Sequence, residues 1–193
     1  MLGSHKQFYD SLLNSERLKT PSDKVTLDLN CGNTCAGVLV IIHFVDDIPY
    51  VVLTKRSPFL TNHSGEISFP GGKFSTTDKS ILDTAIRETS EEIGIVINKK
   101  QIIGRLPTTC TYTSKILIYP FVALEEKIYD KLRPNIEVKQ IINLPVGKLV
   151  DSFSEDELHS NLLLRMFKFS YGEHLIWGAT ARILKDLMNI IAE

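Results

Sequence analysis

This sequence of 193 residues has few cysteines, no excess of either charge and no long apolar run. Its three cysteines, Cys31, Cys35 and Cys110, cannot all pair within the chain, which argues against a disulfide framework. Cys31 and Cys35 also lack a nearby histidine or cysteine pair that would complete a zinc site. With 22 basic and 23 acidic residues, the chain has no positive field of the kind that attracts nucleic acid.

The same absences bear on where the protein acts. No apolar run approaches the ~20 residues that a membrane-spanning helix needs. The first residues contain no apolar segment typical of a secretion signal, and the last residues are not a peroxisomal signal. We therefore expect a reduced, cytoplasmic protein whose partners include neither a membrane nor nucleic acid. The sequence leaves the oligomeric state open, with a homodimer as one option.

Apolar periodicity and turn residues predict one α/β domain behind an N-terminal extension. The extension, residues 1–35, would contain a short amphipathic helix and a polar loop, and residues 36–193 would form the domain. We expect the helices at residues 8–18, 78–94, 145–150 and 178–190, and strands at 36–42, 50–54, 102–107 and 115–123. Residues 163–169 and 174–177 would form a hairpin, with Trp177 packed in the core.

The most informative feature of the chain is a glycine turn followed by a helix that carries three closely spaced carboxylates. Glu88, Glu91 and Glu92 are related as i, i+3 and i+4, so they project from one patch of the helix. Each pair of like charges at this spacing costs a few tenths of a kcal/mol. Mg²⁺, which proteins hold with carboxylates and substrate phosphates, would remove that cost. The alternative is a solvated acidic helix end.

The helix has recognisable ends and an apolar stripe. Asp78 is the expected N-cap and Gly94 the expected stop. Glu88 and Glu92 border the stripe, and Glu91 lies just beyond it. The carboxylates therefore lie where the helix meets the rest of the fold, which suits a cleft better than open solvent.

Gly72 and the segment from Arg87 to Ile95 resemble the signature of the Nudix hydrolases, G-x5-E-x7-R-E-U-x-E-E-x-G-U, in which U is aliphatic. The second half matches at every specified position, as Arg87-Glu88-Thr89-Ser90-Glu91-Glu92-Ile93-Gly94-Ile95. The first half is one residue too long, and Asp78 or Lys79 stands where the family has glutamate. That glutamate usually orients the arginine, so its replacement leaves the partner of Arg87 open. The resemblance implies an αβα sandwich around a mixed β-sheet.

Coenzyme A diphosphatases, a Nudix subgroup, carry an additional upstream motif, L-L-T-x-R-S-x3-R-x3-G-x3-F-P-G-G. This chain is similar at the same spacing, with Val52-Leu53-Thr54-Lys55-Arg56-Ser57, then Gly65, then Phe69-Pro70-Gly71-Gly72. It departs at Val52 and at Thr61, where the subgroup has arginine. Another segment that looks like a subgroup feature is Ile176-Trp177-Gly178-Ala179-Thr180-Ala181-Arg182.

The resemblance implies Mg²⁺- or Mn²⁺-dependent hydrolysis of a diphosphate, with Glu88 and Glu92 as principal metal ligands. Glu91 would be a further ligand or would orient water, and the Gly72 carbonyl would be a backbone ligand. Arg87 would be a structural partner of these carboxylates.

Other polar residues are candidates for contacts with the substrate. Arg56 and Lys73 are candidate phosphate clamps, unless they are ordinary surface cations. His63 would touch substrate or be a solvated loop residue. The general base is open, and Glu137 is a distal candidate.

The expected substrate is a small nucleotide, namely coenzyme A or an acyl derivative cleaved to 3′,5′-ADP and 4′-phosphopantetheine. Hydrolysis of ADP-ribose or NADH is the first alternative, since specificity comes from pocket residues outside the motifs. A non-catalytic Nudix-fold module that binds a nucleotide is the second, although an inactive relative would not need all three glutamates. An RNA-decapping enzyme is a third, weakened by the lack of a basic surface.

Overall fold

A computed structural model describes residues 5–15, 18, 34–58, 65–126, 128, 131–157 and 166–192. The helices are α1 (His5–Asn14), α2 (Ile81–Ile93), α3 (Lys148–Ser152) and α4 (Gly178–Ile191), with a short 3₁₀ turn η1 (Lys99–Gln101). The strands are β1 (Cys35–Val45), β2 (Ile48–Arg56), β3 (Ile67–Ser68), β4 (Gly71–Lys73), β5 (Ile102–Arg105), β6 (Thr109–Cys110), β7 (Leu117–Glu125), β8 (Val138–Pro145), β9 (Phe153–Glu155), β10 (Phe167–Tyr171) and β11 (His174–Ile176).

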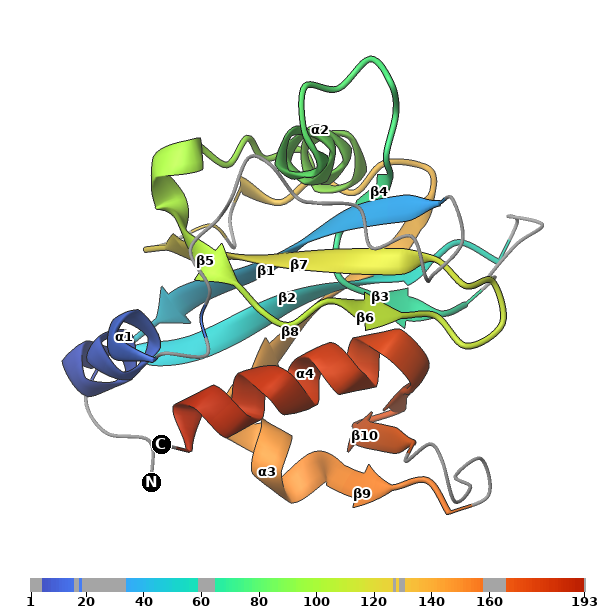
Figure 1. The fold of residues 1–193 in the computed structure, drawn as a ribbon. Coiled ribbons are helices and arrows are strands. Elements are labelled where there is room, and N and C mark those ends of the chain that lie inside the picture. Colours follow the sequence, from blue (N-terminus) through green and yellow to red (C-terminus); the bar gives the residue numbers. More distant parts are fainter. Residues whose placement is uncertain are drawn as a thin grey trace.

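Eight of the described strands form one mixed sheet, and β9, β10 and β11 form a smaller antiparallel one. The large sheet runs β3-β2-β1-β7-β5, with β4 paired to β1, β6 to β7 and β8 to β2. Only the β1–β7 pair of this sheet is parallel among the described pairings. Helix α2 lies on one face of the large sheet, and α4 with α3 lies on the other (Figure 1). The predicted αβα sandwich is confirmed.

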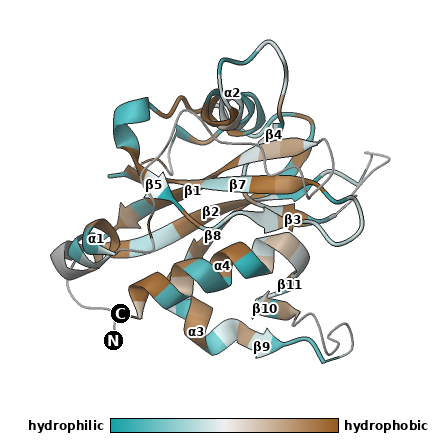
Figure 2. Ribbon diagram, viewed as in Figure 1, coloured by the Kyte–Doolittle hydropathy of each residue, from teal (hydrophilic) through white to brown (hydrophobic). Residues whose placement is uncertain are grey.

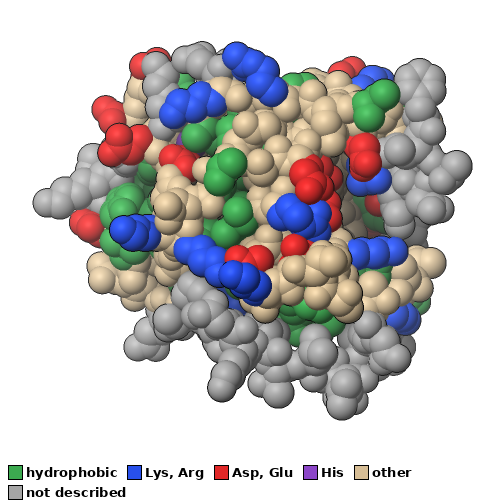
Figure 3. All heavy atoms as spheres, turned by 90° about the horizontal axis from the view of Figure 1, so that it is seen from above, with side chains coloured by type: hydrophobic (Ala, Val, Ile, Leu, Met, Phe, Trp, Pro, Cys, Tyr) green, Lys and Arg blue, Asp and Glu red, His purple; other side chains and the backbone are tan. Residues whose placement is uncertain are grey.

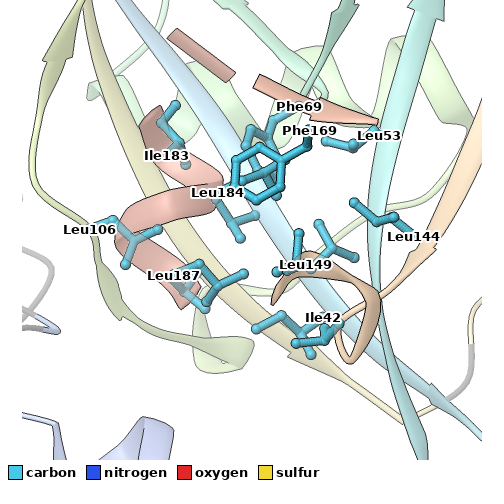
Figure 4. Close-up of a cluster of buried hydrophobic side chains, with 14 of the residues drawn as sticks. Ile42, Leu53, Phe69, Leu106, Leu144, Leu149, Phe169, Ile183, Leu184 and Leu187 are labelled. Atoms are coloured by element: carbon cyan, nitrogen blue, oxygen red, sulfur yellow. The ribbon is translucent and has the colours of Figure 1, made fainter. Parts of the chain in front are cut away.

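Alternation along the central strands places apolar side chains on both faces of the large sheet, because both faces are covered by helices. On the α2 face, Leu39 and Ile41 of β1 pack with Ile81 and Ala85 of α2. On the other face, the core contains residues from the sheet, α3 and α4, as Figure 4 shows. Its labelled members are Ile42, Leu53, Phe69, Leu106, Leu144, Leu149, Phe169, Ile183, Leu184 and Leu187. Apolar and polar residues alternate around α4 in the hydropathy colouring, as an amphipathic helix requires (Figure 2).

Most predicted elements are confirmed with shifted ends. The first helix ends at Asn14, earlier than expected, and strands β1, β2, β5 and β7 and helix α4 all contain most of their predicted residues. Strand β10 starts at Phe167, and the earlier part of its predicted range lies outside the described residues. No helix in the described ranges is both long and apolar enough to cross a bilayer.

The structure corrects the expectations for Pro145, Trp177 and the cysteines. Pro145 ends strand β8, which was not predicted, and the helix begins only at Lys148; a proline is tolerated at a strand end although it cannot donate to a ladder. Trp177 is 51 % exposed and so is not a core residue. Cys110 is disulfide-bonded while Cys35 is free and buried, so the expected fully reduced chain is wrong at Cys110. An odd number of cysteines forbids complete pairing but leaves room for one bond.

Candidate active site

Helix α2, which carries the three glutamates, begins at Ile81 because Ser80 caps it. The Ser80 hydroxyl accepts a hydrogen bond from the Asp83 N–H at 3.2 Å and donates one to the Asp83 carboxylate at 2.7 Å. Gly94 ends the helix in the left-handed conformation, with φ of 76°, as predicted. The expectation that Asp78 is the N-cap was wrong.

Asp78 instead binds Arg87 from the loop before the helix. The Arg87 Nε and Nη2 groups donate to the two oxygens of Asp78, each at 2.9 Å, and the Thr84 hydroxyl donates to one of them at 2.8 Å. The Asp78 side chain is only 8 % exposed, and the hydrogen bonds from Arg87 lower the pKa of its carboxyl group. Asp78, where the family signature has glutamate, is thus a bidentate partner of Arg87.

The same guanidinium contacts two of the helix carboxylates. Arg87 Nη2 lies 2.8 Å from Glu88 Oε1, and Arg87 Nη1 lies 3.1 Å from Glu91 Oε2. Hydrogen bonding to Asp78, with further bonds to Glu88 and Glu91, raises the pKa of Arg87. Arg87 is therefore fully ionised and joins one loop carboxylate to two helix carboxylates.

Glu92 points to a different and more enclosed environment. It is buried, and its carboxylate accepts a hydrogen bond from the Gly71 N–H at 3.1 Å. Arg56, at the end of β2, has its Nη1 4.0 Å from Glu92 Oε1 and its Nη2 3.7 Å from Glu137 Oε2. Burial raises the pKa of Glu92 to about 7, because these contacts replace only part of the lost hydration.

The two glycines of the turn let the backbone of β4 approach both neighbours closely. A Cβ on Gly72 would lie 2.5 Å from Glu88 Cδ, so Glu88 lies directly against the Gly72 backbone. Gly71 has φ of +144°, and a Cβ there would lie 2.2 Å from the Gly37 carbonyl oxygen. Side chains at either position would displace β4, its carboxylate neighbour or the adjoining strand.

The structure brings most of the predicted site residues together. Glu88 and Gly72 are in close contact, and Arg56 links Glu92 to Glu137. Glu91 is largely exposed on the outer side of Arg87, and Lys73 is exposed at the end of β4. His63 and Thr61 lie outside the described residues. On the face that carries α2, acidic and basic side chains lie beside one another (Figure 3).

The donor set suits a hard divalent cation, since it consists of carboxylate and backbone oxygens. Among the residues the structure describes, no three acidic, histidine or cysteine side chains already form a metal cluster, and Glu88 is held by Arg87. Glu92 nevertheless suits a divalent cation, because a nearby dication would stabilise the ionised form of a buried carboxylate whose pKa is raised.

Sequence reasoning missed how the arginine of the upstream motif is placed. Arg56 was expected to clamp phosphate, and nothing in the local sequence indicates that it would lie between Glu92 and Glu137. Glu92 and Glu137 are 36 and 81 positions further along the chain than Arg56, and only the pairing of β2 with β8 brings Arg56 beside Val138.

Comparison with known proteins identifies the family. The NUDIX domain family matches residues 34–157. The chain is 31 % identical over 176 residues to "Mitochondrial coenzyme A diphosphatase NUDT8" of Mus musculus, covering 88 % of this chain and 83 % of that protein. It is 34 % identical over 162 residues to "Uncharacterized Nudix hydrolase NudL" of Photorhabdus laumondii, covering 82 % of this chain and 86 % of that protein.

A solved structure shares the fold. The MutT/nudix family protein of Enterococcus faecalis superposes with a TM-score of 0.58 at 16 % identity, covering 99 % of this chain and 71 % of that one. The family match, these relatives and the carboxylate-bearing helix agree with one another. The chain belongs to the Nudix family and is a hydrolase that acts on diphosphate bonds.

Proposed function

We propose that this Nudix hydrolase cleaves coenzyme A or an acyl derivative, in the presence of Mg²⁺ or Mn²⁺, to 3′,5′-ADP and 4′-phosphopantetheine. The observation that carries the proposal is the position of Arg56. This arginine of the upstream motif lies within 4.0 Å of the buried Glu92 and 3.7 Å of Glu137. The motif is therefore part of the carboxylate site, and relatives about 30 % identical bear the name coenzyme A diphosphatase.

Glu88 and Glu92 would hold the metal, with the Gly72 carbonyl as a backbone ligand and Glu91 as a further ligand or as the group that orients water. When bound, a divalent cation would neutralise diphosphate oxygens and acidify a bound water. The observed Arg87–Glu88 contact of 2.8 Å supports this assignment, because it fixes the direction in which the Glu88 carboxylate points.

The remaining assignments concern the substrate. Arg56 can present two N–H groups to a phosphate, and Lys73 adds a point charge at the end of β4. Glu137, held near Arg56, is the candidate general base for the attacking water. His63 stays a predicted substrate contact. The domain division at residue 36, the cytoplasmic location and the homodimer also stay predictions, and two relatives are named mitochondrial.

A turnover screen tests the proposal. Coenzyme A, octanoyl-coenzyme A, dephospho-coenzyme A, ADP-ribose and NADH would be incubated with Mg²⁺ or Mn²⁺, and the products separated by chromatography. We expect kcat/KM for coenzyme A or its acyl derivative to exceed that for ADP-ribose and NADH. A preference for ADP-ribose or NADH would contradict the substrate assignment but leave the chemistry intact.

Variants of two basic residues make the same screen specific to the site. Arg56→Ala should reduce kcat/KM for coenzyme A by about 100-fold, because it removes a cation beside the reacting diphosphate. Lys148→Ala, which removes an exposed cation on α3 with an ion pair to Asp151 at 3.7 Å, is the matched control and should leave kcat/KM unchanged. Equal effects of Arg56→Ala and Lys148→Ala on kcat/KM would argue against a role for Arg56 beside the reacting diphosphate.

A further inference from the structure

A cavity of about 430 Å³ lies outside the carboxylate site, between the turn after β6 and the small sheet. Its lining is mostly apolar, with a few polar groups, which is the composition of small-molecule pockets. Three of its lining residues are large hydrophobic side chains that are at least half exposed: Tyr112 at 60 %, Leu175 at 53 % and Trp177 at 51 %. The remaining lining residues are Met166, Lys168, Thr113 and the buried Asp156. Exposed apolar side chains gathered around one cavity indicate a ligand rather than core packing.

The segment from Ile176 to Arg182, which is similar to a subgroup feature, helps to build this cavity. Trp177 contributes its half-exposed indole, and Arg182 donates a hydrogen bond from its Nη2 to the carbonyl oxygen of Cys110. Cys110 directly precedes the turn that carries Tyr112. Through this bond, Arg182 of α4 connects the part of the cavity formed by Trp177 to the part formed by the turn with Tyr112.

The turn after β6 and the start of α4, which contribute Tyr112 and its neighbour Trp177 to the cavity, lie at the same end of the large sheet as β4 (Figure 1). Across the sheet, Gly72 pairs with Gly37 of β1, β1 pairs with β7, and β7 pairs with Thr109–Cys110 of β6. Strands β4 and β6 are therefore three strand spacings apart in the sheet, a distance of roughly 14 Å. In addition, β11, which carries Leu175, packs against β3, and β3 ends just before the glycine turn.

We propose that this cavity binds the acyl-pantetheine arm of the substrate, with its apolar end between Trp177, Tyr112 and Leu175. The inference rests on the proposed function. The distance between the cavity and the carboxylate site favours the pantetheine arm over the adenine base. The arm is long and flexible, whereas the adenine is joined to the diphosphate through the ribose alone. The apolar lining favours an acyl chain, and Lys168 supplies a donor for a carbonyl group of the arm.

Trp177 is the sole tryptophan of the chain, so its fluorescence reports on the cavity directly. Octanoyl-coenzyme A, octanoyl-pantetheine and ADP-ribose would be titrated in EDTA, so that turnover does not interfere. We expect both octanoyl compounds to shift the emission saturably to shorter wavelength, because the indole is removed from water. ADP-ribose, which lacks the arm, should leave the emission unchanged. An equal shift with ADP-ribose, or none with either octanoyl compound, would overturn the inference.

Steady-state kinetics of matched variants give a second measurement. Leu175→Ala should raise KM for octanoyl-coenzyme A by about tenfold and leave KM for unacylated coenzyme A nearly unchanged, since it removes apolar contact with the chain alone. Ile48→Ala, which truncates a side chain of similar exposure (49 %) on β2, is the control. If Leu175→Ala changes both KM values equally, or neither, the acyl chain does not occupy the cavity.

The two proposals can fail separately, because octanoyl-pantetheine has no diphosphate. If coenzyme A compounds are not hydrolysed while octanoyl-pantetheine shifts the emission of Trp177, the substrate proposal is wrong and the cavity assignment stands. If coenzyme A is hydrolysed while the emission does not move and Leu175→Ala is silent, the cavity assignment is wrong and the substrate proposal stands.

Discussion

At the residue scale, Arg87 divides its contacts between carboxylates of different kinds. Asp78 is buried and bidentate, whereas Glu88 and Glu91 are 25 % and 57 % exposed on their side chains. Charge-assisted, bidentate pairs are the strongest of these contacts, so Asp78 fixes the guanidinium and the guanidinium then orients Glu88.

Replacement of Asp78 tests whether Asp78 fixes Arg87 and Arg87 in turn orients Glu88. Asp78→Asn keeps the size of the side chain but loses its charge, which should cost about 1–3 kcal/mol of unfolding free energy because Arg87 loses a buried charged partner. We expect kcat to fall about tenfold, since Arg87 without its charged partner would no longer hold the Glu88 carboxylate in one position. Urea unfolding and kcat at saturating Mg²⁺ measure the two effects. Asp151→Asn, at a 71 % exposed side chain, is the control, and an unchanged kcat for Asp78→Asn would refute the orienting role.

Glu92 provides a sharper prediction about the metal. Glu92→Gln preserves an acceptor for the Gly71 N–H and the shape of the side chain, but it removes the charge that a cation needs. We expect kcat to fall at least 100-fold without loss of the fold, as checked by circular dichroism. Glu126→Gln, at an exposed position after β7, should retain full activity. Turnover near that of the wild type would exclude Glu92 as a ligand.

The residue types of the site were predictable, whereas their partners were only partly so. The i, i+3, i+4 spacing of the glutamates placed them on one patch without knowledge of the fold. Asp78 was one of two residues considered for the position of the family glutamate, and its predicted role as the helix N-cap was wrong. Aspartate is one methylene shorter than glutamate, and the longer loop lets its carboxylate reach Arg87 all the same.

At the element scale, the position of α2 depends on glycines in the strands below it. Gly37 of β1 pairs with Gly72 of β4 across the sheet. A Cβ on Gly37 would lie 2.3 Å from the Ile81 carbonyl oxygen, in the first turn of α2, whereas the atoms nearest to a Cβ on Gly72 belong to the Glu88 side chain. Gly37 therefore leaves room for the backbone of α2, and Gly72 leaves room for the Glu88 carboxylate.

Alanine at position 37 should mainly lower stability, whereas alanine at position 72 should mainly lower turnover. Gly37→Ala should lower the unfolding free energy by about 2 kcal/mol or more, because helix backbone has to move and packing along α2 is lost. Gly72→Ala should cost less stability but reduce kcat at least tenfold, because the displaced group is a flexible carboxylate in the site. Thermal unfolding and turnover of both variants decide the matter. Equal stability losses would mean that Glu88 cannot move away.

Elements were predictable where one pattern dominated the local sequence. Strands β1 and β7 have long apolar runs, and α2 has both a periodic stripe and a glycine stop. Strand β8 was missed because Pro145 was taken as a helix start, although Ile142 and Leu144 alternate with polar or less buried neighbours. Its pairing with β2 is a long-range contact that no local pattern specifies.

At the scale of the whole molecule, the fold keeps a carboxylate in a place that favours its neutral form. The pKa of Glu92 is raised from 4.5 to about 7 by burial. The folded state therefore binds a proton that the unfolded state releases between these pH values, so this group makes the protein less stable as pH rises from about 4.5 to about 7. At about 1.4 kcal/mol for each pH unit, the loss is at most about 3 kcal/mol.

Glu92→Gln should abolish that part of the pH dependence. In EDTA, the variant and the wild type should unfold at similar urea concentrations near pH 4.5, and the variant should be the more stable by up to about 3 kcal/mol at pH 8. Mg²⁺ should narrow the difference at pH 8, because a ligand that binds only the folded wild type stabilises it. A difference that does not vary with pH would contradict the raised pKa.

An α/β domain and a helix with three clustered glutamates could be derived from the sequence, because both depend on local periodicity, spacing and residue type, which act over a few turns of chain. The αβα architecture and the chemistry were implied by the resemblance of the same residues to the Nudix signature. The folded structure was needed to show that Asp78 holds Arg87, that Arg56 lies between Glu92 and Glu137, and that Trp177 lines a cavity and is not in the core. Those outcomes depend on strand pairing and on burial, because groups distant in the sequence meet only when the sheet and its helices have packed.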